Sequence, residues 1–159
     1  MAAQLGEKKV DVDLFTDAAL LSVLPAADLV IVGCDAIRPD SFINKVGTFA
    51  LLCMARHFRI PFYVVADSFK FLPAKLENWF GIRTESAIEV WRTPGKSVLV
   101  RNFYFERVPL QGCAAVVTDS GVWAPGKIRS ILQKTEVASG LKSATGNRES
   151  VDSQQESFL

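Results

Sequence analysis

The spacing of hydrophobic and polar residues changes several times along the chain, and each pattern predicts a different element. Residues 10–15 alternate between apolar and acidic side chains, which is typical of a half-exposed strand. Residues 28–32, 61–66 and 113–117 are apolar without alternation, as in strands that are covered on both faces of a sheet. These runs predict a mostly parallel sheet.

Helical patterns separate the predicted strands. Asp17 is placed to cap a short helix over residues 18–24, which Pro25 ends. Residues 45–58 are apolar around most of a helix circumference, so we expect this helix to pack against the sheet. A last helix is expected over residues 125–134, with a proline early in its first turn, where the missing N–H costs little.

The order of these elements predicts the fold class. The strand at 28–32, the helix at 45–58 and the strand at 61–66 form a right-handed parallel βαβ unit. A further short strand is expected over residues 87–91. The chain is therefore expected to be α/β, with a mostly parallel sheet flanked by helices.

The chain length and the polar segments predict the domain organisation. At 159 residues and 49% hydrophobic content, the chain has enough apolar surface for one buried core. Residues 1–9 form a short lead and residues 10–134 form the domain. Residues 135–159 form a polar tail that we expect to be disordered.

Charge and cysteine content exclude several classes of protein. Eighteen basic and seventeen acidic residues nearly cancel, so we expect no direct nucleic-acid binding and no anionic membrane surface as a partner. The chain shows no signal-like segment and no apolar run long enough for a membrane span, so we expect a cytoplasmic protein. The three cysteines form no Cys-x-x-Cys pair, and neither a disulfide framework nor a metal site is expected.

The candidate chemistry lies where the predicted strands end. Asp35 follows the strand at 28–32, at the end where open α/β sheets bind ligands. Its carboxylate is either a general acid or base, or a cap that accepts hydrogen bonds from the backbone N–H groups of its loop. Asn44 and Lys45 are expected at the start of the next helix, where free N–H groups and a lysine favour an anion; the alternative is a solvated lysine.

Lys70 follows the strand at 61–66. Its aromatic neighbours Phe69 and Phe71 either anchor the loop and direct the amine over the sheet end, or pack while the amine faces water. Cys34 is expected on the opposite side of its strand from Asp35, so we do not expect it to be a nucleophile. The chain lacks a Walker loop and a Gly-x-Gly-x-x-Gly motif, so no cofactor is expected. We expect Asp35, Lys45 and Lys70 to converge at one rim of the sheet around a negatively charged ligand.

Several segments, in order, carry a resemblance to a known family. They are DLVIVGCDAI (28–37), INKVGT (43–48) and PFYVVADSFKF (61–71), followed by RNFYFE (101–106) and VTDSGV (117–122). This set resembles the family of the alpha, beta and delta regulatory subunits of translation initiation factor 2B. The same family contains ribose-1,5-bisphosphate isomerase and methylthioribose-1-phosphate isomerase.

The resemblance implies a Rossmann-like domain that dimerises and binds a phosphorylated sugar or nucleotide. In the isomerases, an aspartate matching Asp35 is the acid/base partner of a cysteine, and an Asn-Lys pair matching Asn44 and Lys45 contacts the substrate. A lysine matching Lys70 contacts the substrate in the ribose bisphosphate branch.

The resemblance covers only the C-terminal half of the family's chain, so we expect a partial domain whose N-terminal part is missing. A helical region and a catalytic cysteine of the isomerases lie before the matching segments, and no residue here matches that cysteine. The loop over residues 35–44 is also one residue shorter than the isomerase pattern and lacks its glycine. A sheet that starts midway is expected to expose an apolar edge.

The predicted function is that of an initiation-factor-2B-subunit-like protein of protein biosynthesis, without independent catalysis. It would bind a phosphorylated sugar or nucleotide and form a homodimer or associate with related initiation-factor subunits. The alternative is an aldose–ketose isomerase of the ribose-1,5-bisphosphate type, with Asp35 as its acid/base.

Overall fold

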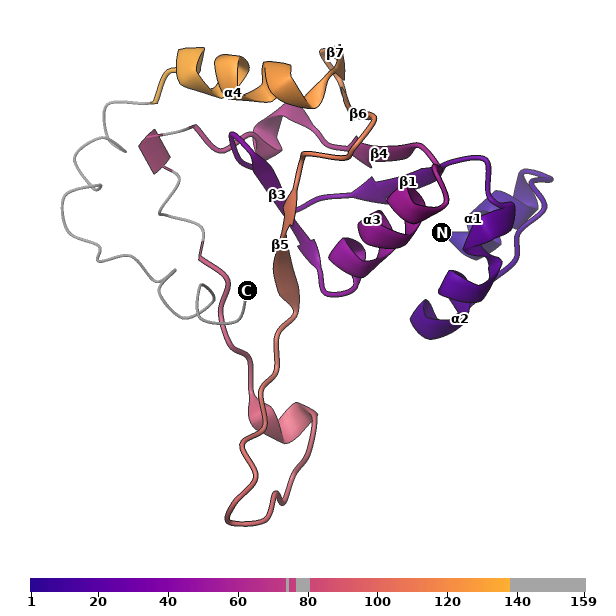
Figure 1. Cartoon of the computed structure of the whole chain (residues 1–159), viewed down its shortest axis with the longest axis vertical. Helices are drawn as coiled ribbons and strands as arrows, with labels where there is room; N and C mark the ends of the chain where they lie inside the picture. The colour runs from indigo at the N-terminus through magenta and orange to yellow at the C-terminus, as the bar shows by residue number, and fades with distance from the viewer. Residues whose placement is uncertain (74, 77–80, 138–159) are drawn as a thin grey trace.

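The computed structural model describes residues 1–73, 75–76 and 81–137 (Figure 1). Of the predicted polar tail, residues 135–137 are described, and the rest lies outside the described residues. The predicted extents of the lead and the tail therefore stay predictions.

The larger sheet has four strands in the order β1-β4-β6-β7. β1 (Val30–Gly33) pairs in parallel with β4 (Phe62–Val65), and β4 pairs in parallel with β6 (Ala115–Thr118). β7 (Gly121–Trp123) returns antiparallel to β6. The three apolar runs are thus parallel neighbours, which confirms the predicted α/β fold with a mostly parallel sheet.

A second sheet was not predicted. β2 (Ala36–Ile37), β3 (Ser41–Lys45) and β5 (Phe105–Pro109) pair antiparallel in that order. Two of its strands, β2 and β3, lie in the segment after β1 that the sequence suggested to be a polar loop. The stretch looks polar, yet Arg38 and Ser41 are buried within it.

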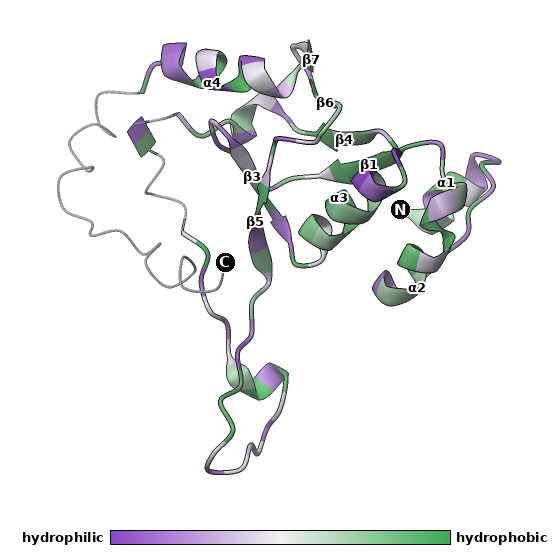
Figure 2. Ribbon diagram, viewed as in Figure 1, coloured by the Kyte–Doolittle hydropathy of each residue, from purple (hydrophilic) through white to green (hydrophobic). Residues whose placement is uncertain are grey.

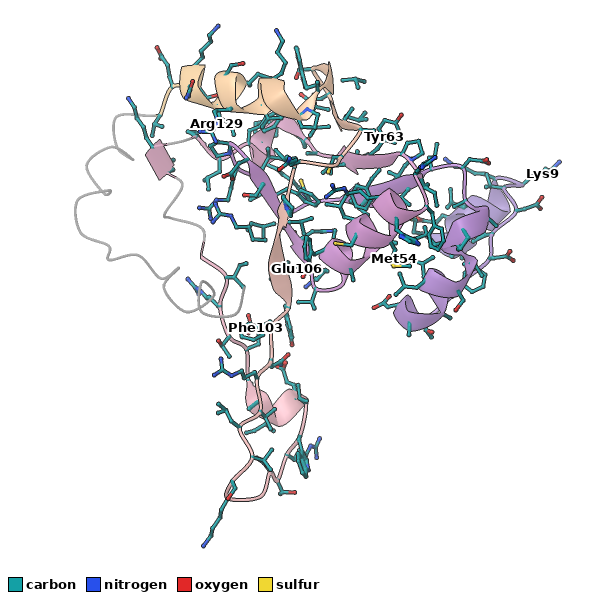
Figure 3. All side chains as sticks on the ribbon, in the orientation of Figure 1. Lys9, Met54, Tyr63, Phe103, Glu106 and Arg129 are labelled. Atoms are coloured by element: carbon teal, nitrogen blue, oxygen red, sulfur yellow. The ribbon has the colours of Figure 1, made fainter. Side chains whose placement is uncertain are left out.

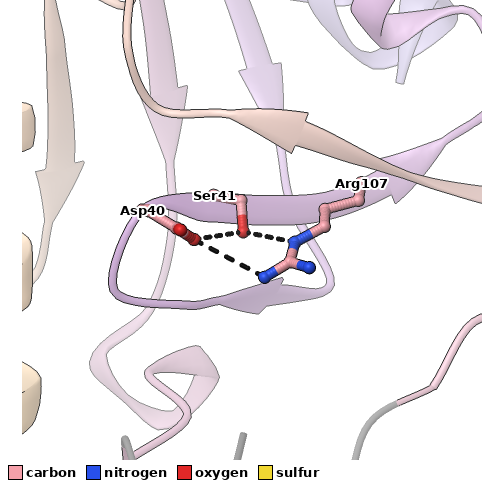
Figure 4. A network of polar contacts seen from close by, with 3 residues as sticks. All are labelled: Asp40, Ser41 and Arg107. Carbon is pink, nitrogen blue, oxygen red and sulfur yellow. Dashed lines mark hydrogen bonds and ion pairs between the residues drawn. The ribbon is translucent and has the colours of Figure 1, made fainter. Parts of the chain in front are cut away.

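A polar network joins the β2–β3 turn to β5 (Figure 4). The guanidinium of Arg107 donates from Nε to Ser41 Oγ over 2.9 Å and lies 3.6 Å from a carboxylate oxygen of Asp40. Ser41 Oγ in turn donates to Asp40 Oδ1 over 2.9 Å. These contacts hold the hairpin against a strand that lies more than sixty residues later in the chain.

The helices lie outside the sheets (Figure 1). Their bounds are as follows: α1 (Ala2–Glu7), α2 (Asp17–Val23), the 3₁₀ helix η1 (Leu24–Ala26), α3 (Thr48–His57), the 3₁₀ helices η2 (Ser68–Lys70) and η4 (Ala87–Glu89), and α4 (Pro125–Lys134). The prediction for α4 is confirmed at both ends. The helix after Asp17 is also confirmed, although Thr16 is its N-cap and Asp17 its first residue.

Three local predictions were wrong. Residues 10–15 form no strand, since no described strand lies beside them and alternation alone does not hold an isolated strand. Residues 87–91 contain η4, not a strand; Trp91 N–H donates to the Ala87 carbonyl. The central helix begins at Thr48, not Lys45, because residues 41–45 pair with β5 and Gly47 takes a φ of 103°.

The core lies where the two sheets, α3 and α4 meet. Its large side chains with almost no exposure come from both sheets, α3 and α4: Ile37, Phe42, Leu52, Phe62, Val64, Val108, Val116, Ile128 and Leu132. Figure 2 shows the hydrophobic colouring of β1, β4 and most of α3. This shared core fixes the strand ends relative to one another.

Apolar residues also remain on the surface. β1 forms one end of the larger sheet, and Leu29 and Ile31 are 48% and 61% exposed there. A long arm over residues 82–104 extends away from the sheets (Figure 1) and carries further exposed apolar side chains.

The core position of Phe62 generates a stability prediction. Phe62→Ala removes a ring that is 1% exposed at the centre of the parallel sheet, and we expect a loss of ~3–5 kcal/mol in unfolding free energy by urea denaturation. Phe69→Ala is the matched control, because Phe69 is 94% exposed and should change stability by only ~0.5 kcal/mol. Equal losses in the two variants would contradict this packing.

Candidate functional site

The carboxyl ends of the three parallel strands lie along one edge of the larger sheet. Cys34 and Asp35 follow β1, residues 66–70 follow β4, and Asp119 follows β6. Open α/β sheets bind their ligands at this edge. The polar side chains that leave these strand ends therefore define the candidate site.

Lys70 lies across the end of β1. It is the last residue of η2, whose N-cap Asp67 accepts a hydrogen bond from Phe69 N–H at 3.0 Å. Its ammonium Nζ donates to the Cys34 carbonyl over 2.5 Å. An ammonium has three N–H donors, so this contact fixes its position and uses one of them.

Asp35 is the next residue after that carbonyl. Its side chain is exposed, and its backbone N–H donates to the Ile43 carbonyl over 2.8 Å. This bond joins the end of β1 to β3 at the residue before Asn44. The Lys70 ammonium and the Ile43 carbonyl thus both contact the main chain at residues 34–35, and Asn44 follows Ile43.

The Cys34 thiol is buried, whereas the neighbouring Asp35 is exposed. Burial raises its pKa to about 12, although the charge of Lys70 acts in the lowering direction and that of Asp35 adds to the rise. The thiol is therefore protonated at neutral pH and is a poor nucleophile.

The sequence predicted that Asn44 and Lys45 begin a helix. In the structure they are instead the last two residues of β3. The Asn44 amide Nδ2 donates to Thr48 Oγ1 over 3.0 Å, and that hydroxyl donates to the Lys45 carbonyl over 2.6 Å. The reason for the error is the long-range pairing of β3 with β5, which outweighs the helical pattern of the segment.

The start of α3 already has an acidic partner. Phe49 N–H donates to Glu106 Oε1 over 2.8 Å, and Figure 3 labels Glu106 on β5 beside this helix. A carboxylate at a helix N-terminus is stabilised by the helix dipole. The sequence analysis missed Glu106 because only the register of β3 and β5, which places it opposite Asn44, brings it there.

The Lys45 ammonium lies over aromatic rings of the arm and β5. Nζ is 3.9 Å from the ring centroid of Phe105 and 4.9 Å from that of Tyr104. Such contacts hold a cation by the electrostatic attraction of the ring face. The structure therefore assigns a defined position to Lys45, whereas its convergence with Asp35 and Lys70 on one ligand stays a prediction.

Two other residue classes add little to this edge. His57 is exposed at the end of α3 and makes an edge-to-face contact with Phe58, as expected for a surface histidine. In the described part of the chain, no group of three or more His, Cys, Asp or Glu residues is arranged to hold a metal ion.

No described helix is long and apolar enough to cross a lipid bilayer.

The parallel sheet, its flanking helices and the polar groups at one edge define a Rossmann-like α/β domain. Residues 1–125 match the model of the Initiation factor 2 subunit family, and the chain belongs to this family.

Similar proteins carry two kinds of name. A ribose 1,5-bisphosphate isomerase of Methanocaldococcus jannaschii is 28% identical over 84% of this chain and 44% of its own length. A putative translation initiation factor eIF-2B subunit 2-like protein of Pyrococcus furiosus is 30% identical over 79% of this chain and 44% of its own length. The crystal structure of subunit delta of eIF-2B from Archaeoglobus fulgidus superposes with a TM-score of 0.69 and 32% identity, over 82% of this chain and 41% of that chain. The chain thus spans less than half the length of these relatives.

The burial of the cysteines generates a labelling prediction. With iodoacetamide at pH 8, exposed Cys53 should react first in the native protein. Cys34 and Cys113 should react only after unfolding, because burial raises their pKa values to about 12 and 11. Peptide mass spectrometry over time measures the order, and native labelling of Cys34 as fast as Cys53 would contradict the buried position.

Proposed function

We propose that the chain is a ligand-binding and subunit-associating protein of the initiation-factor-2B type, without catalysis of its own. The ligand is a phosphorylated sugar or a nucleotide. The observation that carries this proposal is the Lys70 ammonium, held at the carboxyl end of β1 beside exposed Asp35.

A phosphoryl group suits this edge for electrostatic reasons. Lys70 is held by one hydrogen bond to a neutral carbonyl, so its charge is not cancelled by that contact. Two further N–H groups of an ammonium suit phosphate oxygens, with which charge-assisted hydrogen bonds form. The isomerases among the relatives are named for sugar phosphates, which supports the same ligand class.

Asn44 and Lys45 complete the proposed binding residues. Asn44 follows Ile43, whose carbonyl accepts a hydrogen bond from the Asp35 N–H. Lys45 is placed on the faces of Phe105 and Tyr104, so part of the ordering of its long side chain precedes ligand binding. We propose that the amide contacts sugar hydroxyls and that the lysine adds positive charge at the edge of the site.

The state of the cysteines favours binding without turnover. Isomerisation of an aldose to a ketose needs protons moved at adjacent carbons, and the resemblance implies that an aspartate and a cysteine share this task. Cys34 adjoins Asp35, but its thiol is buried and its pKa is raised to about 12. It is therefore unsuited to be the second proton-transfer group.

An isomerase is the second candidate function. One observation favours it: Asp35 is an exposed carboxylate at the end of a buried parallel strand, where an acid/base residue would reach a substrate. In that case, Asp35 would act together with a group outside the described residues.

The arm over residues 82–104 supports subunit association. Its stem is held by Asn102, which donates to the Ser86 carbonyl and to Glu89, and by the Thr84–Phe103 bridge. Its exposed apolar residues are Ile88, Val90, Trp91, Val98, Leu99, Phe103 and Tyr104. Large exposed apolar patches mark protein–protein contacts, and these side chains all lie on one segment. We propose that the arm contacts a second copy of the chain, with a related initiation-factor subunit as the other possible occupant.

The proposed compartment is the cytoplasm. Cys34, Cys53 and Cys113 are all free thiols, which fits a reducing environment.

Substitution of Lys70 tests the binding site. Lys70→Ala removes the ammonium at the end of β1, and we expect ribose 1,5-bisphosphate affinity to fall roughly tenfold or more by isothermal titration calorimetry. Lys8→Ala, in the N-terminal segment, is the matched control and should bind like the unmodified chain.

Equal affinities in the two lysine variants would remove Lys70 from the site. If the unmodified chain converts ribose 1,5-bisphosphate and Asp35→Asn abolishes the conversion, the isomerase candidate replaces the non-catalytic one.

A charge placed on the arm tests association. Leu99 is 76% exposed, and Leu99→Asp should weaken self-association roughly tenfold in sedimentation velocity experiments, because it places a carboxylate in the proposed apolar contact. Leu14→Asp is the control at another highly exposed leucine, which is 84% exposed and lies outside the arm. A monomeric chain at all concentrations would rule out the second copy, and capture of a related subunit would identify the other occupant.

A further inference from the structure

Asp119, at the end of β6, makes a two-oxygen contact with the turn that carries Lys70. Ser68 N–H donates to Asp119 Oδ1 over 2.8 Å, and the Ser68 hydroxyl donates to Asp119 Oδ2 over 2.9 Å. Both carboxylate oxygens are therefore engaged by one residue, fifty-one positions earlier in the chain. The Ser68 N–H and then its hydroxyl hold the pKa of Asp119 below its usual range, so the carboxylate is ionised at neutral pH.

Asp119 is itself held in place by the turn between β6 and β7. Thr118 Oγ1 accepts hydrogen bonds from Ser120 N–H at 3.2 Å and from Trp123 Nε1 at 3.3 Å. The same hydroxyl donates to the Gly121 carbonyl over 2.9 Å. The carboxylate thus projects from a turn that is fixed to the parallel sheet.

The turn that Asp119 contacts lies between two segments that are fixed to the sheets: Ala66 N–H donates to the Val117 carbonyl, and Leu72 N–H donates to the Ile37 carbonyl. η2 contains no buried residue, and Phe69 at its centre is 94% exposed. Between these fixed ends, the contacts of η2 with other strands are polar: Ser68 with Asp119, and Lys70 with the Cys34 carbonyl. Asp67 caps it from within, whereas Asp119 ties it to a different strand of the sheet.

We infer that Asp119 is a positioning residue for the anion site, acting through Lys70. The contact with Ser68 fixes the first residue of η2, and the Lys70 ammonium at its other end is thereby directed to the Cys34 carbonyl. The ends of three parallel strands then form one site. Asp119 after β6 holds η2, which follows β4, and the Lys70 ammonium of η2 lies at the end of β1, where the ligand would bind. This inference rests on the proposed function only for the ligand, since the contact itself does not depend on it.

The test combines affinity with local amide exchange. Asp119→Asn keeps the size of the side chain but replaces one acceptor with an NH₂ donor that faces Ser68. We expect ribose 1,5-bisphosphate affinity to fall about tenfold, with faster hydrogen exchange confined to residues 68–71 and an unchanged unfolding midpoint. Asp28→Asn, at an exposed carboxylate before β1, is the control and should change neither quantity.

A double variant separates positioning from direct contact. In a Lys70→Ala background, Asp119→Asn should cause no further loss of affinity, because its effect passes through the ammonium. A further loss of the same size would show that Asp119 acts independently of Lys70 and would overturn the inference. Unchanged exchange at residues 68–71 in the single variant would overturn it as well.

The outcomes also separate this inference from the proposed function. If Lys70→Ala weakens binding and Asp119→Asn does not, the anion site stands and the positioning role fails. If Lys70→Ala has no effect while Asp119→Asn still accelerates exchange at residues 68–71, the tie exists but the proposed anion site fails.

Discussion

Parallel pairing of β1, β4 and β6 is the constraint on which the candidate site depends. Parallel strands that pair side by side end at the same edge, so residues distant in sequence leave the sheet together. The buried valines of these strands maintain the register, and Val64 and Val116 have no exposed surface. The buried strands bring the polar residues that follow them to one edge, and contacts such as Ser68 with Asp119 then position them there.

The antiparallel sheet has a different role at the same edge. It joins the end of β1 to β5. It also supplies the Glu106 carboxylate, which accepts a hydrogen bond from a backbone N–H at the start of α3. Glu106 occupies the helix N-terminus, which in many α/β proteins receives a phosphate. In the proposed site, the positive groups are therefore the side chains of Lys70 and Lys45, and not the N–H groups of α3.

The elements that the sequence predicted are those whose signal is local. The apolar runs of β1, β4 and β6 and the proline-led α4 were all recognisable, and with them the positions of Asp35 and Lys70 after strand ends. The β2–β3 hairpin was missed because its partner β5 lies sixty residues later and its buried Arg38 and Ser41 look like loop residues. The same long-range pairing moved Asn44 and Lys45 from an expected helix into a strand.

β1 has a consequence for the behaviour of the chain in solution. Within the described residues it has a neighbour on one side only, so alternate N–H and C=O groups along its outer side point away from β4. With Leu29 and Ile31 exposed beside them, these groups form a template for the addition of another strand. A net charge of +1 provides little repulsion between molecules. At high concentration we therefore expect association by strand addition at β1, opposed by little electrostatic repulsion.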